Sequence, residues 1–141
     1  MFGKKKIISQ PNSHITSLIG AETKINGDIS FTGGLRIEGH VTGNITGLGD
    51  NPSTLMLSDG SFVEGKIRVS HAVINGTVVG PIQSDEYLEL QSKANISGRI
   101  SYKNIETQLG ATVDGTVHRV VKAEPDTRIV ALISPSEARN P

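Results

Sequence analysis

The chain has 141 residues, which suggests one domain, and its 14 Lys and Arg residues balance 14 Asp and Glu residues. This neutrality argues against bulk nucleic-acid binding, and the lack of cysteine excludes disulfides, thiolate catalysis and thiolate metal sites. Apolar residues make up 35% of the chain but aromatic residues only 4%, a composition that favours a narrow aliphatic interior over a broad globular core.

Residues 1–16 form a basic and partly apolar arm without an acidic residue. Within the arm, residues 1–8 are followed by polar residues rather than an apolar core, so we expect no secretory signal, and no later run is long and apolar enough for a spanning helix. One interpretation is a disordered, solvated terminus. The other is a membrane anchor, in which each lysine contributes about 1 kcal/mol on anionic lipid and many copies bind through avidity. The membrane-binding residues would be Met1, Phe2, Lys4, Lys5 and Lys6.

Residues 17–120 repeat one short phrase: a β-branched residue, any residue, Gly, any residue, and another β-branched residue. The six main copies start 15 to 22 residues apart, at Ile25, Val41, Val63, Val78, Ile96 and Val113. Because side chains alternate along a strand, the apolar ends and the central Gly should face inward while the polar pair faces water. A unit of this length that recurs indicates a solenoid.

A second apolar pair precedes the phrase, as at Leu35 and Ile37 or Leu88 and Leu90, so each repeat holds two or three short strands. At about 3.3 Å per residue, one repeat makes a loop about 55 Å around that can stack on the next at about 4.8 Å. We therefore predict an all-β fold, a right-handed parallel β-helix of about six coils over residues 17–120. Flexible segments, 1–16 and 121–141, would flank it.

A left-handed hexapeptide helix is the alternative fold. It is suggested by apolar residues at six-residue spacing, a spacing that fails at Gly43. These residues are Ile19, Ile25, Phe31 and Ile37. On that fold the chain would be a trimeric enzyme of the zinc hydratase or acyltransferase type, and a monomeric binding module is a third interpretation.

Three segments depart from the regular repeat. Residues 47–52 read as an insertion that forms a loop at a coil corner, and residues 84–86 as another corner. The tail contains five consecutive apolar residues, Ile129-Val130-Ala131-Leu132-Ile133, between Pro125 and Pro135. This run either covers the open end of the last coil or binds a partner.

No pattern of catalytic or cofactor-binding residues is present. There is no Gly-rich phosphate loop, no dinucleotide fingerprint and no G-x-S-x-G elbow. The histidines lack metal-ligand spacing, and we expect them to be exposed polar corner residues rather than a zinc site between subunits. They are His14, His40, His71 and His118. We therefore predict that the chain is not an enzyme and that it has no catalytic, cofactor or metal site.

The two terminal coils of such a solenoid leave backbone groups unpaired, and the sequence predicts no helical cap at either end. End-to-end stacking would bury aliphatic side chains and pair these groups without nucleotide. We predict a homopolymer, whose interface residues would be Ile19, Ile25, Ile29, Leu109, Val113 and Val117.

Three parts of the sequence carry a family resemblance: the start Met-Phe-Gly with its lysines, residues 35–45 (LRIEGHVTGNI), and residues 96–102 with 109–115. In this order they are similar to the membrane-targeting stretch, the opening repeat and the closing coils of one family, the bactofilins. Two departures are Val113, where the family often has Phe, and the apolar run in a tail that is usually polar and Pro-rich.

The resemblance implies a bacterial cytoskeletal protein with a right-handed β-helix. Such a protein would assemble without nucleotide into non-polar filaments through its terminal coils. It would lie in the cytoplasm on the inner face of the cell membrane. Its partners would be further copies of itself, the membrane surface and cell-wall synthesis or hydrolysis proteins, which it would localise with effects on cell shape.

Overall fold

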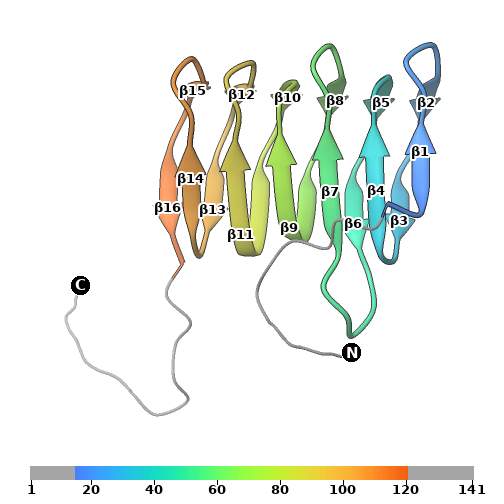
Figure 1. Ribbon diagram of the computed structural model, residues 1–141, viewed down its shortest axis with the longest axis horizontal. Helices are drawn as coiled ribbons and strands as arrows, with labels where there is room; N and C mark the ends of the chain where they lie inside the picture. The colour runs from blue at the N-terminus through green and yellow to red at the C-terminus, as the bar shows by residue number, and fades with distance from the viewer. Residues whose placement is uncertain (1–14, 121–141) are drawn as a thin grey trace, which may run out of the picture.

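The computed structural model describes residues 15–120, which form an all-β solenoid with no helix among them (Figure 1). Sixteen short strands wind into six stacked coils, and each strand pairs in parallel with strands of neighbouring coils. The predicted all-β parallel solenoid of about six coils is confirmed. The N-terminal arm, including Met1, Phe2, Lys4, Lys5 and Lys6, and the tail from residue 121 lie outside the described residues.

Each coil contributes one strand to each of three lateral faces. Face 1 consists of β1 (Ser17–Ile19), β4 (Gly34–Ile37), β7 (Thr54–Leu57), the second halves of β9 (Ile67–Ile74) and β11 (Ile82–Leu90), and β14 (Ile105–Thr107). Face 2 consists of β2 (Lys24–Asn26), β5 (His40–Thr42), β8 (Phe62–Glu64), β10 (Thr77–Val79), β12 (Asn95–Ser97) and β15 (Thr112–Asp114). Face 3 consists of β3 (Ile29–Phe31), β6 (Ile45–Gly47), the first halves of β9 and β11, β13 (Ile100–Tyr102) and β16 (Val117–Arg119). Coil 1 therefore begins with β1, and coil 6 ends with β16.

In-register pairing lines up equivalent residues of successive coils in columns that fill the interior. The face 2 column is Ile25, Val41, Val63, Val78, Ile96 and Val113. The face 3 column is Ile29, Ile45, Ile67, Ile82, Ile100 and Val117. One face 1 column is Ile19, Ile37, Leu57, Ile74, Leu90 and Thr107. The narrow space between three faces suits aliphatic side chains, which explains the low aromatic content.

The Gly-centred phrase is not one strand, as the alternation predicted, but two strands joined at a corner. Its first apolar residue lies on face 2 and its last on face 3. At the corner between them Gly65 has a φ of +150°, which other residues rarely adopt. A Cβ on Gly65 would also meet the carbonyl oxygen of Gly43 in the preceding coil. The corner glycines of the six coils are Gly27, Gly43, Gly65, Gly80, Gly98 and Gly115.

The corner between faces 3 and 1 is less regular. Residues 48–53 form the loop that links β6 to β7, as the insertion predicted (Figure 1). Residues 84–86 do not separate two strands; they form a register irregularity within β11, between Ser84 and Tyr87. The Ser84 hydroxyl donates to the Tyr87 carbonyl at 2.6 Å, so the side chain stabilises this bend. The described chain enters β1 and leaves β16 at this same corner, at opposite ends of the rod (Figure 1).

Candidate assembly surfaces at the two ends of the solenoid

The inner columns are buried in the middle of the rod and uncovered at its ends. Val41 and Ile45 of coil 2 are 0% exposed, whereas their partners in coil 1, Ile25 and Ile29, are only partly buried. At the other end, Ile100 of coil 5 is 0% exposed while Val117 of coil 6 is 47% exposed. The difference arises because each inner coil is covered from both sides and each terminal coil from one side.

These uncovered residues define two apolar end surfaces. The N-terminal end surface comprises Ile19, Ile25 and Ile29 of coil 1, and the C-terminal end surface comprises Ile105, Val113 and Val117 of coil 6. Among the six predicted interface residues, Ile19, Ile25, Ile29, Val113 and Val117 occupy these inner positions.

Leu109, the sixth predicted interface residue, does not occupy an inner position. It lies in the turn between β14 and β15 and is 96% exposed. The second inner position of face 1 in coil 6 is Ile105, which pairs with Leu88. Ile105 is not among the predicted interface residues, although the alternation of Leu88 and Leu90 could have pointed to it.

The backbone hydrogen bonds show which groups the ends leave facing outward. The N–H group of Gly98 donates to the Asp114 carbonyl at 3.0 Å, and that of Ile100 donates to the Thr116 carbonyl at 2.8 Å. The equivalent N–H groups in coil 6 belong to Gly115 and Val117, which have no following coil among residues 15–120. The C-terminal end surface therefore combines aliphatic side chains with the edge of a parallel sheet.

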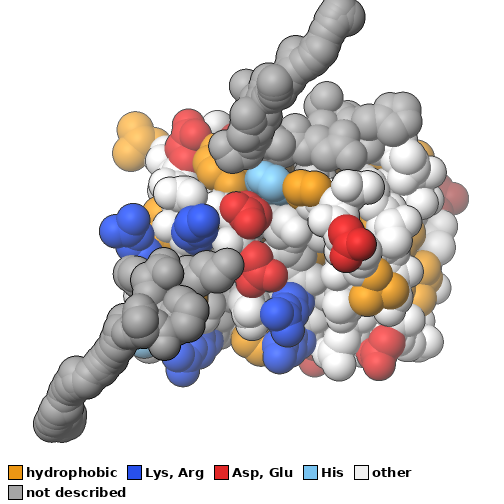
Figure 2. Space-filling view, turned by 90° about the horizontal axis from the view of Figure 1, so that it is seen from below, with side chains coloured by type: hydrophobic (Ala, Val, Ile, Leu, Met, Phe, Trp, Pro, Cys, Tyr) orange, Lys and Arg blue, Asp and Glu red, His pale blue; other side chains and the backbone are white. Residues whose placement is uncertain are grey.

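Charged side chains lie on the lateral faces and corners rather than at the inner positions of the end surfaces. Residues 17–120 carry 8 basic and 11 acidic residues. The ion pairs between Arg36 and Glu38 at 3.1 Å and between Arg68 and Asp85 at 3.8 Å are exposed, so each contributes little stability. Basic and acidic side chains are interspersed over the surface seen in Figure 2, and this interspersion leaves no broad patch of one sign there.

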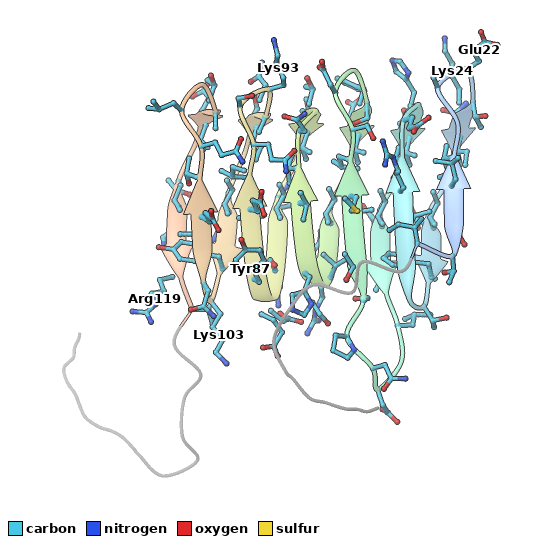
Figure 3. The ribbon with its side chains drawn as sticks, in the orientation of Figure 1. Glu22, Lys24, Tyr87, Lys93, Lys103 and Arg119 are labelled. Atoms are coloured by element: carbon cyan, nitrogen blue, oxygen red, sulfur yellow. The ribbon has the colours of Figure 1, made fainter. Side chains whose placement is uncertain are left out.

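Coil 6 is also held to coil 5 by a polar contact on face 1. The Tyr87 hydroxyl donates to Glu106 of β14 at 2.7 Å and lies 3.2 Å from a carboxylate oxygen of Glu89 (Figure 3). Desolvation by burial, followed by the hydrogen bond to Glu106 and the two negative charges, raises the pKa of Tyr87 above its ordinary value. The phenol, which an ordinary tyrosine pKa already keeps protonated at neutral pH, therefore stays protonated and donates further into the alkaline range.

The described histidines do not converge on one site. His40 lies on face 2, His71 on face 1 and His118 on face 3; His14 is outside the described residues. The expectation of an exposed position is wrong for His71, which is 1% exposed because Thr54 and Tyr87 of the adjoining coils flank it. Within residues 15–120 no group of three or more His, Cys, Asp or Glu residues is placed to hold a metal ion.

No helix in this same part of the chain is long and apolar enough to cross a membrane. A separate observation concerns the ends of the rod, which interrupt columns that are otherwise buried.

Comparisons with known proteins agree with this geometry. A family model described as "Bactofilin: Polymer-forming cytoskeletal" matches residues 17–118. The chain is 26% identical over 112 residues to bactofilin BacP of Myxococcus xanthus (strain DK1622). That alignment covers 79% of this chain but 45% of the relative, so the chain spans less than half of the relative's length. No solved structure matches the chain.

Proposed function

Because the chain belongs to the bactofilin family of polymer-forming cytoskeletal proteins, we propose that it assembles end to end into filaments through its two end surfaces. The filaments are non-polar: N-terminal end surfaces meet each other, and C-terminal end surfaces meet each other. The observation that carries this proposal is the exposure of the inner columns at both ends and nowhere between.

The physical argument is that a joint completes what each terminal coil lacks. Full burial of an aliphatic side chain contributes about 1.5–3 kcal/mol, and Ile19, Ile25 and Ile29 are each part-way there. A joint doubles this gain because both copies contribute, and it pairs the free sheet edges as well. Burial and backbone pairing supply the free energy, so assembly needs no nucleotide.

The test replaces one inner residue by a charged one and compares it with its outward neighbour on the same strand. Val113→Arg places a cation on the C-terminal end surface and should abolish long filaments, since an unpaired charge would be buried in the joint. Asp114→Arg, the matched control on β15, projects outward and should leave filaments intact. Negative-stain electron microscopy and sedimentation report both; full-length polymers of Val113→Arg would exclude this end as a joint.

We further propose that the filament lies on the inner face of the cytoplasmic membrane through the arm that carries Met1, Phe2, Lys4, Lys5 and Lys6. The described chain starts at the corner between faces 3 and 1 (Figure 1), so arms of coaxially stacked copies can project along one edge. One arm with three lysines binds weakly, whereas many arms on one polymer bind through avidity.

Deletion of residues 2–6 tests the anchor. The truncated chain should fail to sediment with anionic vesicles while it still forms filaments, because the deletion leaves residues 15–120, which form the solenoid, unchanged. Neutral phosphatidylcholine vesicles serve as the control, and the intact chain should bind them much less than anionic ones. Unchanged binding of the truncated chain to anionic vesicles would assign membrane contact to another part of the protein.

In this proposal the protein is a scaffold rather than an enzyme. A membrane-bound filament with polar lateral faces would localise partner proteins such as cell-wall synthesis or hydrolysis enzymes, and so affect cell shape. The cytoskeletal character of the family supports this role. The alternative of a trimeric enzyme with zinc between its subunits has no convergence of described histidines in its favour.

A further inference from the structure

The sequence that follows coil 6 continues the spacing of the coils. Coil 6 has four inner positions on the columns: Ile105 and Thr107 on face 1, Val113 on face 2 and Val117 on face 3. Sixteen residues after each of these lie Val121, Ala123, Ile129 and Ile133. Sixteen residues also separate coil 1 from coil 2 on faces 2 and 3, where Ile25 pairs with Val41 and Ile29 pairs with Ile45. The apolar run 129–133 is thus a seventh copy of the phrase.

Only the corner position of this copy departs from the others. Sixteen residues after Gly115 the chain has Ala131 instead of Gly. A Cβ on Gly115 would meet the carbonyl oxygen of Gly98, and a Cβ on Ala131 would meet that of Gly115 in the same way. Ala131 would also need a φ near the +154° of Gly115, which is strained for an L residue. A seventh coil is therefore favoured along its strands and opposed at one corner.

The C-terminal end surface matches such a segment in both side chains and backbone. In register, Ile129 would cover Val113 and Ile133 would cover Val117. The pattern by which Gly98 and Ile100 donate to coil 6 would direct the N–H groups of Gly115 and Val117 to the carbonyls of Val130 and Leu132. Residues 124–127, Glu-Pro-Asp-Thr, would occupy the place of the turn at 108–111, and Pro followed by Asp is typical of a turn.

We propose that residues 121–133 dock on the C-terminal end surface of their own chain as a weak seventh coil. Ala131 keeps this coil weak, so a second copy of the chain can displace it. The segment is thus a cap that competes with filament joints at one end only. Its competition with joints rests on the proposed function, whereas the docking itself does not, because the docked segment is detectable in an isolated chain.

The test uses cysteine pairs, which are clean in a chain without native cysteine. Asp114→Cys combined with Val130→Cys places two thiols at outward positions that the docked coil brings into register. Ser97→Cys combined with Asp114→Cys is the positive control, since these residues pair in the described structure. Asp114→Cys combined with Ser136→Cys is the negative control, with the second thiol a similar distance along the chain but beyond the seventh copy.

In dilute full-length protein, the pair at 114 and 130 should form a disulfide within one chain, seen on non-reducing gels, far faster than the pair at 114 and 136. Ala131→Gly should speed it further, whereas Ala138→Gly, the same change outside the copy, should not. Equal rates for the two pairs would overturn the proposal. A disulfide that links two chains instead would identify a second copy as the occupant and would also overturn it.

Discussion

Coil 1 and coil 6 end the same columns, yet they present different surfaces. On the three columns that start at Ile19, Ile25 and Ile29, coil 6 has Thr107, Val113 and Val117. The N-terminal end surface thus offers three isoleucines, whereas the C-terminal one offers two valines on these columns and Ile105 on the column whose coil 1 member is Ser17. Since the apolar area buried sets the gain from burial, the N-terminal joint should be the stronger of the two.

The corner glycines differ between the ends as well, because a Cβ at this corner would point toward the preceding coil. A Cβ on Gly115 would point into the preceding coil and meet the Gly98 carbonyl, whereas a Cβ on Gly27 would have nothing within 4 Å. The same residue type therefore stabilises the fold at one end and leaves room for a neighbouring chain at the other. The comparison shows that the rod has two chemically distinct ends despite its regular repeat.

The largest expected effect comes from blocking the stronger joint. Ile25→Arg should leave only the C-terminal joint and yield mostly monomers, at concentrations where Val113→Arg still gives dimers through its intact N-terminal surface. Sedimentation velocity of both variants distinguishes these species. Asn26→Arg, the outward neighbour on β2, is the control and should assemble normally. The same mixture of monomers and dimers from Ile25→Arg and Val113→Arg would contradict the prediction that the N-terminal joint is stronger than the C-terminal one.

A smaller effect separates folding from assembly. Gly115→Ala should lower the free energy of unfolding by more than the about 1–2 kcal/mol expected from the strained φ alone, because its Cβ also meets backbone. Gly27→Ala should lose only the strain term but should impair filament formation, since its Cβ projects into the joint. Urea unfolding below the assembly concentration measures the first quantity and pelleting assays the second. Equal stability losses would contradict the direction assigned to the corner.

The smallest effect concerns the proposed cap. Ala131→Gly relieves both the contact with Gly115 and the φ strain, so the cap should hold more firmly and the critical concentration for filaments should rise a few-fold. The matched change Ala138→Gly should leave it unchanged. Light scattering over a dilution series gives both values. A lower critical concentration for Ala131→Gly would indicate that the segment promotes joints rather than competing with them.

Much of this fold could be predicted because its repeat is nearly regular. The spacing of Ile25, Val41 and the residues that continue their column predicted the number and length of the coils, and the aliphatic composition indicated a narrow interior. The phrase was predicted as a single strand although the chain turns at its Gly. The error arises because the first and last residues of the phrase face inward in both cases. The positive φ of Gly65 leaves no separate mark in the sequence, since Gly also suits a flat strand.

Errors at single positions share another physical cause: pattern gives spacing but not where a strand stops. Leu109 was predicted as an interface residue together with Val113 and Val117, but β14 ends at Thr107 and the next four residues form a turn, so Leu109 shares no inner column with them. His71 was expected at an exposed corner, but β9 runs through that corner without extra residues. Neighbouring coils then bury the imidazole. Ile105 was missed for the same reason, because the sequence pattern does not show that β14 spans Ile105–Thr107.

The central claim is that the two uncovered ends of the solenoid join copies of the chain. Negative-stain electron microscopy of the purified protein, with no nucleotide added, tests it most directly. We predict long, unbranched filaments whose axial repeat corresponds to pairs of six-coil rods, since alternate joints differ. Isolated particles at high protein concentration would contradict it.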